Sequence, residues 1–250
     1  MNVRQRTAVI TGALGGIGTA LVDIFSKADY RVIATDCRAN SEPALPASYV
    51  GADLERFVND ERYAQGVITE IKSLFANEGL DVLVNNAAIQ LIGNIEKISR
   101  EDWKRTLDVN LTAALFLSQA FLADLEKTAG NVINISSIHS RLTKKSFIAY
   151  ATSKAALSGL TRALAVDLGG RVRVNAIEPA AIDTAMLHAG FAQEPERYQQ
   201  LKESHPQRRI GTTTEVAQLA LAIVEGKFGF MHGACLSLDG GISCKLHDPR

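Results

Sequence analysis

The segment that decides the fold runs from residue 7 to residue 18, and it reads Thr7-Ala8-Val9-Ile10-Thr11-Gly12-Ala13-Leu14-Gly15-Gly16-Ile17-Gly18. Its first five residues have the composition of a buried strand, and a segment of helical period follows the glycines. A glycine-rich turn in this context binds phosphate at the helix N-terminus. We expect Gly12 to permit the tight turn, Gly16 to admit a pyrophosphate and Gly18 to allow close helix–strand packing. Leu14 and Ile17 belong to the same loop.

Short β-branched runs alternate with helical segments along the rest of the chain. The predicted strands are Thr7–Thr11, Arg31–Thr35, Tyr49–Ala52, Val82–Asn85, Val132–Ile135, Val172–Ala176 and Cys235–Leu238, and the predicted helices are 15–28, 60–77, 100–126, 150–168 and 213–225. Continuous apolar strands in strand–helix–strand order indicate a parallel sheet buried on both faces. We therefore predict an α/β protein with one nucleotide-binding domain over residues 1–250: a Rossmann-like, doubly wound parallel sheet of about seven strands with helices on both faces.

Two segments qualify this pattern. The twelve residues between Asp36 and Tyr49 are too few for a crossover helix, so a loop is predicted there. The polar segment 183–209 interrupts the alternation and is either a substrate lid or a plain surface insertion. Thr212 and Glu215 have the spacing of a capping box, which should open the last long helix.

Composition excludes several classes of protein. Lys and Arg balance Asp and Glu at 27 each, which gives no electrostatic footprint for nucleic acid or for an anionic membrane. Three scattered cysteines suit a reducing compartment and show no metal-ligand spacing, and the five histidines show none either. No leader precedes the first strand, and no apolar run is long enough to span a bilayer. We expect a cytoplasmic protein without a metal or a membrane partner.

The end of the second predicted strand indicates which dinucleotide is bound. Asp36 lies 18 residues beyond Gly18, where a carboxylate accepts hydrogen bonds from the adenosine ribose and repels a 2′-phosphate. Arg38 is the residue that argues for the phosphorylated cofactor, because it is close enough to meet a 2′-phosphate. On balance the sequence favours NAD over NADP.

A possible catalytic group stands at the start of the fourth predicted helix. Tyr150 and Lys154 are four residues apart and therefore share one face, and Ser137 follows the preceding strand. A phenol with a pKa of about 10 is a poor base at neutral pH. A neighbouring ammonium, together with an oxidised nicotinamide, would stabilise the phenolate. Tyr150 could then take the proton of an alcohol as its carbon loses hydride, while Ser137 holds the reacting oxygen and Lys154 holds the nicotinamide ribose.

Read in order, these pieces resemble the short-chain dehydrogenase/reductase family of the 250-residue type. The matching residues are Thr11–Gly18, Asp53-Leu54, Asn85-Asn86-Ala87-Ala88, Asn110, Ser137, Tyr150 with Lys154, Asn175 with Pro179, and Leu238-Asp239-Gly240-Gly241. The chain departs from the family pattern in two places. Ala88 and Ala180 stand where the family usually has glycine, which matters only if the backbone there needs a positive φ.

The resemblance implies further roles. It places Asp53 against the adenine with Leu54 beside it, and Asn86 in the cofactor cleft. It makes Asn110 the residue that anchors a water beside the catalytic lysine, and it sets Ile182 and Thr184 against the nicotinamide amide. Family members also form dimers and tetramers through two helices, here those of Trp103 and Leu157, so a homo-oligomer is expected.

The function expected from the sequence is therefore NAD-dependent interconversion of a secondary alcohol and a ketone. Two alternatives stay open: an NADP-dependent carbonyl or 3-oxoacyl reductase, and a nucleotide-binding sensor without catalysis. The fold hosts many functions, so the sequence does not name the substrate or the direction of reaction. The substrate pocket should comprise residues 88–96, 138–147 and 183–205. His139 lies in that region and is considered for a role in the pocket, rather than for acid–base duty, which Tyr150 already fills. The basic cluster Arg141, Lys144 and Lys145 also lies there, and it either attracts an acidic substrate or, as the favoured alternative, belongs to a solvated loop.

Overall fold

A computed structural model describes residues 4–40, 45–75, 78–191, 194–226 and 228–246. The strands are β1 (Thr7–Thr11), β2 (Arg31–Asp36), β3 (Ser48–Gly51), β4 (Val82–Asn85), β5 (Asn131–Ile135), β6 (Arg173–Pro179) and β7 (Cys235–Leu238). They form one parallel sheet in the order β3-β2-β1-β4-β5-β6-β7. The predicted fold class is confirmed.

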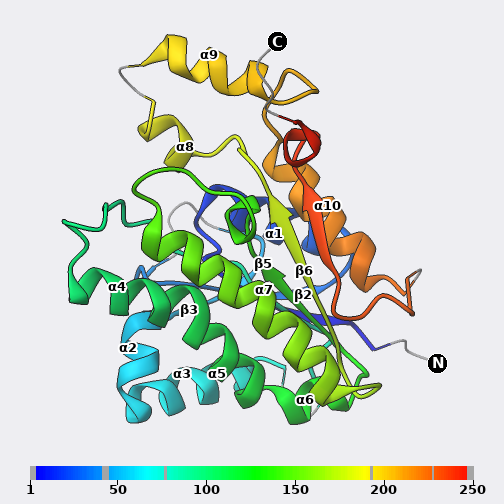
Figure 1. The fold of residues 1–250 in the computed structure, drawn as a ribbon. Coiled ribbons are helices and arrows are strands. Elements are labelled where there is room, and N and C mark those ends of the chain that lie inside the picture. Colours follow the sequence, from blue (N-terminus) through cyan, green and yellow to red (C-terminus); the bar gives the residue numbers. More distant parts are fainter. Residues whose placement is uncertain (1–3, 41–44, 76–77, 192–193, 227, 247–250) are drawn as a thin grey trace.

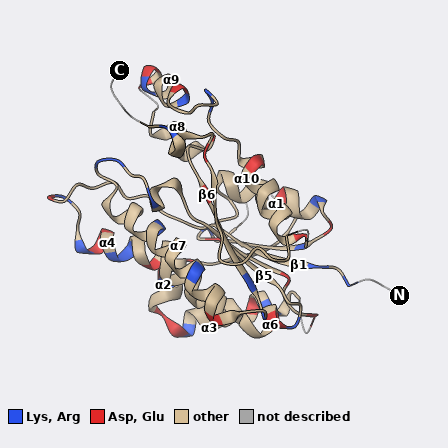
Figure 2. Cartoon of the chain, turned by 45° about the vertical axis from the view of Figure 1, so that its right-hand side comes forward, with Lys and Arg blue, Asp and Glu red and all other residues tan. Residues whose placement is uncertain are grey.

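Helices cover both faces of this sheet (Figure 1). They are α1 (Gly16–Lys27), α2 (Leu54–Asn59), α3 (Glu61–Ser73), α4 (Arg100–Leu107), α5 (Ala113–Ala120), α6 (Leu122–Glu126), α7 (Ile148–Leu168), α8 (Ala185–Ala189), α9 (Pro195–Ser204) and α10 (Thr213–Val224). Three short turns complete the fold: a π-helical turn, η2 (Asp108–Thr112), and two 3-10 turns, η3 (Ile138–Ser140) and η4 (Ile242–Cys244). Basic residues (Lys and Arg) and acidic residues (Asp and Glu) both occur on these helices (Figure 2).

The alternation of side chains along each strand divides the core into two. Ala8 and Ile10 of β1 face α1 and α10, which pack against each other, whereas Val9 faces the layer that contains α3, α5 and α7. Both groups of side chains are fully buried. The continuous apolar runs in the sequence thus follow from burial on both faces of a parallel sheet.

Several predicted boundaries change in the structure. The single helix predicted over 100–126 is divided into α4, η2, α5 and α6, and α2 was not predicted. β6 continues to Pro179, past the predicted end at Ala176. The described residues between Asp36 and Tyr49 contain no helix, as expected, and positions 41–44 lie outside the described residues. The capping box at Thr212 and Glu215 is formed.

The glycine loop fits between β1 and α1 because its glycines lack side chains. Gly12 has a φ of +63°, a conformation that residues with a side chain rarely adopt. A Cβ added to Gly18 would lie 2.0 Å from the carbonyl oxygen of Gly12. The first turn of α1 therefore rests directly on the end of β1, which confirms the packing role expected for Gly18.

We predict that Gly18→Ala lowers the free energy of unfolding by about 1–3 kcal/mol, because the added carbon overlaps a backbone atom that cannot move alone. The measurement is urea unfolding followed by circular dichroism. Gly66→Ala in the interior of α3 is the matched control, since a Cβ there meets no atom within 4 Å. It should raise stability by up to about 1 kcal/mol. Equal stability of the Gly18 variant and the natural chain would contradict the packing argument.

Candidate active site

A cavity of about 1120 Å³ opens at the carboxyl ends of the strands. It lies where the order of the strands reverses, since β1 has β2 on one side and β4 on the other. Ligands of open α/β sheets bind at this switch point. All predicted cofactor and catalytic residues except Asn110 line the cavity: Gly12, Leu14, Gly16, Ile17, Gly18, Asp36, Asp53, Leu54, Asn86, Ser137, Tyr150, Lys154, Ile182 and Thr184.

The glycine loop forms a phosphate-sized cradle at one wall. Gly15 precedes α1 without a side-chain hydrogen bond to the helix, so the first N–H groups keep their capacity to bind an anion. Asn86 supports the loop, because its Nδ2 donates to the carbonyl oxygens of Thr11 at 2.9 Å and Gly12 at 3.0 Å. A Cβ on Gly16 would lie 3.0 Å from the methyl carbon of Thr184, so the segment after β6 closes over the loop.

The end of the cavity formed by β2 and α2 carries acidic side chains. The Asp36 carboxylate accepts a hydrogen bond from the Leu14 backbone N–H at 3.1 Å. Arg38 folds onto the same group, with its Nε 3.6 Å from Asp36 Oδ1, and donates to the carbonyl oxygen of Leu14. Asp53 caps α2 by accepting from the N–H groups of Glu55 and Arg56. Its cap explains the helix that the sequence analysis missed.

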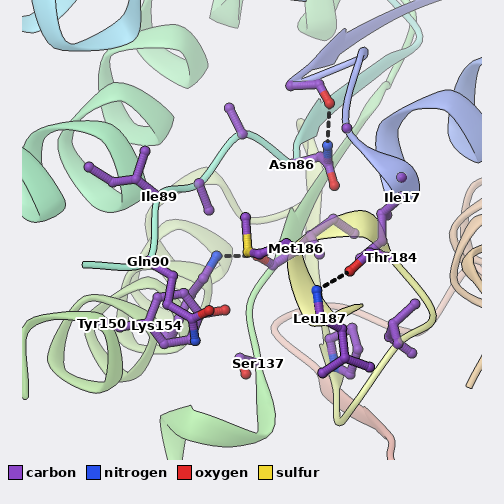
Figure 3. A pocket seen from close by; sticks show the side chains of 18 of the residues that line it. Ile17, Asn86, Ile89, Gln90, Ser137, Tyr150, Lys154, Thr184, Met186 and Leu187 are labelled. Carbon is purple, nitrogen blue, oxygen red and sulfur yellow. Dashed lines mark hydrogen bonds between the residues drawn. The ribbon is translucent and has the colours of Figure 1, made fainter. Parts of the chain in front are cut away.

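Tyr150, Ser137 and Lys154 meet at the opposite wall, where Tyr150 and Lys154 lie beside Gln90 (Figure 3). Ser137 Oγ accepts from the His139 N–H at 3.1 Å and is hydrogen-bonded to Tyr150. Lys154 Nζ donates to the carbonyl oxygen of Ile135 at 2.8 Å and lies 5.7 Å from the centre of the Tyr150 ring. Figure 3 shows Thr184, Met186 and Leu187 across the cavity from this group.

Burial changes the pKa values of both titratable groups at this wall. It lowers the pKa of Lys154 from its ordinary value of 10.5 to about 8. Desolvation raises the pKa of Tyr150, and the hydrogen bond with Ser137 only partly offsets this. Stabilisation of the phenolate by the ammonium together with an oxidised nicotinamide stays a prediction.

Asn110 occupies the π-helical turn η2. Its Oδ1 accepts from the Ile89 N–H at 2.8 Å, and its Nδ2 donates to the carbonyl oxygen of Ile89 and to Ser153 Oγ. The side chain is buried and joins the strand-end loop to the first turn of α7. The π turn accommodates these bonds and divides the long helix that the sequence predicted.

An aromatic wall adjoins Tyr150 on the substrate side. The rings of His139 and Phe147 stack at 4.7 Å, and both meet the Tyr150 ring edge to face. His139 also shares a hydrogen bond of 3.0 Å with Thr143 through Nδ1. Burial, with Lys144 nearby, lowers the pKa of His139 to about 4, so the ring is neutral at physiological pH. His139 lines the cavity, as a role in the pocket requires, and that role stays a prediction.

The predicted basic cluster separates in the structure. Arg141 turns away from the cavity toward Glu178, with Nη2 3.0 Å from a carboxylate oxygen, and also contacts Ser237. Lys144 lines the cavity, and Lys145 does not. Lys144 therefore belongs to the cavity wall, whereas Arg141 belongs to the group of residues around Glu178 behind it.

Glu178 is a functional-site residue that the sequence analysis missed. It is 1% exposed at the end of β6 and accepts hydrogen bonds from Ser140 at 2.7 Å and Ser158 at 2.8 Å, in addition to its contact with Arg141. These bonds tie the turn that follows Ser137 to β6 and α7. A carboxylate between Ile177 and Pro179 in a largely buried strand was the available signal, because such a group is buried only when it is paired.

The two departures from the family pattern cause no strain. Among the described residues, the non-glycine positions with positive φ are Asp29, Ala129, Ser146 and Arg208, and neither Ala88 nor Ala180 is one of them. A methyl group at these positions is therefore tolerated.

A protein-family model described as enoyl-(acyl carrier protein) reductase matches residues 12–243. A curated relative, trans-4-hydroxycyclohexanecarboxylate dehydrogenase of Sinomonas cyclohexanicum, is 31% identical, with 96% of this chain and 93% of the relative covered. The chain belongs to the short-chain dehydrogenase/reductase family. As a family member it is an oxidoreductase that acts on alcohol and ketone groups with a nicotinamide cofactor.

Solved structures agree with this membership. Aldohexose dehydrogenase of Thermoplasma acidophilum superimposes with a TM-score of 0.91 at 28% identity, covering 99% of this chain and 97% of that one. A putative NAD(P)-dependent gluconate 5-dehydrogenase of Beutenbergia cavernae with bound NADP has a TM-score of 0.86 at 33% identity, covering 96% and 97%.

Two features are absent from the described ranges. None of their helices has the length and apolar character needed to cross a bilayer. No group of three or more His, Cys, Asp or Glu side chains in them is arranged to hold a metal ion.

We predict that Glu178→Gln lowers the free energy of unfolding by about 1–3 kcal/mol, because it leaves the Ser140, Ser158 and Arg141 donors without a charged acceptor. Urea unfolding measures the change. Glu126→Gln is the matched control, since Glu126 pairs with Arg171 at 2.6 Å on the surface. An exposed pair of this kind contributes less than about 1 kcal/mol. Similar losses for the two variants would show that the burial of Glu178 has no energetic consequence.

Proposed function

We propose that this enzyme interconverts a secondary alcohol and a ketone with NAD(H), and that Tyr150 is the general acid and base. One observation carries the proposal: Ser137, Tyr150 and Lys154 converge on one wall of a cavity whose other end is the glycine loop. A dinucleotide that spans these two ends brings its reactive ring to the Tyr150 wall.

The lining of the cavity fits such a cofactor. The glycine loop leaves room for a pyrophosphate, because Gly12 needs its positive φ and side chains on Gly16 or Gly18 would collide with their neighbours. Asp36 and Asp53 supply hydrogen-bond acceptors for the adenosine, with Leu54 beside them, and Asn86 steadies the loop. Ile182 and Thr184, on the segment that closes over Gly16, would meet the nicotinamide amide.

Asp36 supports NAD in preference to NADP. Its carboxylate lies at the adenosine end, where a 2′-phosphate would meet a like charge. Arg38 is already engaged with Asp36 and Leu14 and is thereby partly neutralised. The NADP bound in the Beutenbergia cavernae protein favours the alternative of an NADP-dependent carbonyl or 3-oxoacyl reductase. The affinity comparison below distinguishes the two.

The proton step follows from the hydrogen bonds around Tyr150. When bound, the nicotinamide ring supplies the acceptor for hydride in oxidation and the donor in reduction. Ser137 can donate its hydroxyl proton to the substrate oxygen while its Oγ accepts from the His139 N–H. In oxidation Tyr150 takes the alcohol proton, and in reduction it returns one. Lys154 holds the cofactor ribose and gives the phenolate a nearby positive charge.

Ionisation of Tyr150 needs two positive charges, that of Lys154 and that of the oxidised nicotinamide. Desolvation raises the pKa of Tyr150, so we infer that the base forms only in the presence of the oxidised cofactor. The place of Asn110 in a proton path to solvent stays a proposal. It is supported by the hydrogen bond from Asn110 to Ser153, the residue next to Lys154.

The segment 183–209 is proposed as a substrate lid of the single domain. Its helices α8 and α9 lie beyond the carboxyl end of β6 (Figure 1), and Met186, Leu187, Phe191 and Leu201 line the cavity. We also propose a homo-oligomer, a dimer or a tetramer, because α4 and α5 leave Trp103, Leu115 and Phe116 exposed. The three free cysteines support a cytoplasmic location.

Tyr150→Phe should reduce kcat for a secondary alcohol by about 10²–10⁴-fold, because the variant lacks the group that exchanges the proton. The measurement is NADH formation against a panel of alcohols, with NADH affinity by fluorescence as the control for folding. Full turnover by the variant would remove Tyr150 from the chemistry. A natural chain that binds NADH and turns over no alcohol or ketone would favour the non-catalytic sensor instead.

The natural chain should bind NADH at least about ten-fold more tightly than NADPH, a difference of roughly 1.4 kcal/mol. Asp36→Ala should remove most of this difference, because the repulsion of the 2′-phosphate disappears. Asp23→Ala is the control, since Asp23 is an exposed carboxylate of α1 that pairs with Lys27. Tighter binding of NADPH by the natural chain would refute the argument from Asp36.

A further inference from the structure

The charges along the cavity are distributed unevenly. The acidic residues of the described lining are Asp36, Asp53 and Glu55, and all of them belong to the adenosine end. Beyond Tyr150 the lining comes from residues 138–147, from α8 and α9, and from Ile242. No Asp or Glu occurs in this described part of the lining, which we call the substrate end. Its charged residue is Lys144.

Lys144 is held in place at the wall of the substrate end. Its Nζ lies 4.5 Å from the centre of the Phe147 ring. Phe147 in turn stacks on His139 and meets Tyr150 edge to face at 6.2 Å. The ammonium therefore rests on the same aromatic group that contacts the proposed catalytic phenol. An aromatic face attracts a cation, but it does not neutralise its charge.

The other cations of the described lining each have a protein acceptor. Arg38 lies against Asp36, Arg105 pairs with Glu55 at 2.9 Å, and Lys154 donates to the carbonyl of Ile135. Lys144 has no carboxylate within 4.0 Å among the residues that the structure describes. Lys144 is an exposed residue, but contact with the cavity wall desolvates its ammonium enough to lower its pKa. A cation at a cavity wall without a protein carboxylate beside it can be paired by an anionic ligand.

We propose that the substrate carries a carboxylate, and that Lys144 binds it at the substrate end of the cavity. This inference rests on the proposed function, because it identifies the substrate class of the same site. A single ammonium matches the single negative charge of a carboxylate. His139, Thr143 and Gln90, which also line the cavity, are neutral hydrogen-bonding groups that suit the remaining oxygens of such a substrate.

The contacts of Phe147 guide the choice of probe. Phe147 contacts both Lys144 and Tyr150. We therefore test a substrate in which the carboxylate and the reacting carbon are separate: a six-membered ring with an oxo group at one end and a carboxylate at the opposite end.

Binding to the enzyme–NADH complex tests the proposal without depending on turnover. The probes are 4-oxocyclohexanecarboxylate, its primary amide and 4-oxocyclohexyl phosphate, with binding measured by titration calorimetry under conditions in which hydride transfer is absent or corrected for. The natural chain should bind the carboxylate at least about ten-fold more tightly than the amide, as expected for a charge-assisted contact. Lys144→Met should abolish this preference. Lys145→Met is the matched control and should retain it, because Lys145 does not line the cavity.

Three results would overturn the proposal: equal binding of the acid and the amide, no binding of either, or a preference that persists in Lys144→Met. Tightest binding of the phosphate would reassign the site to a phosphorylated substrate. Turnover is measured separately on the same ketones. A chain that binds the carboxylate through Lys144 but reduces none of the ketones would refute the proposed function and keep the anion site.

Discussion

The contact between α1 and the end of β1 is the constraint on which the rest of the structure depends. A helix can begin this close to a strand only because Gly18 has no side chain where the carbonyl oxygen of Gly12 lies. The same contact leaves the first N–H groups of α1 directed at a space without side chains. The missing side chain of Gly18 therefore explains both the close packing of α1 and the space for an anion at its N-terminus. The sheet then places the carboxyl ends of the neighbouring strands around that space.

Both burial and hydrogen-bond or ion-pair partners affect the charged side chains inside the cavity. At the end of the cavity formed by Asp36 and Asp53, both carboxylates accept hydrogen bonds from backbone N–H groups, and Arg38 lies beside Asp36. At the Tyr150 wall, Lys154 has a single carbonyl partner and its pKa falls to about 8. The pKa shifts of Lys154 and Tyr150 have one main cause, because both side chains are removed from water at this wall.

The support behind the site shows how a buried charge can position a loop. Glu178 joins β6, α7 and the turn after Ser137 through three partners, and the same turn carries His139. Removal of such a carboxylate would leave several donors without an acceptor. The position of Ser137 relative to Tyr150 thus depends on residues that never touch the cavity. Asn110 plays a comparable part, because it links the Ile89 loop to Ser153 on α7.

By itself, the sequence determined the order of strands and helices, the glycine loop, and the sites of Asp36, Ser137, Tyr150 and Lys154. Local patterns decide these features: apolar runs, glycine where the turn requires it, and two residues one helical turn apart. Only the tertiary structure decided that η2 interrupts the long helix around Asn110, that Glu178 takes Arg141 away from the basic cluster, and that Lys144 stays at the cavity without a carboxylate. These outcomes depend on contacts between residues distant in sequence, such as Glu178 with Ser140 and Asn110 with Ile89, and spacing along the chain does not encode them.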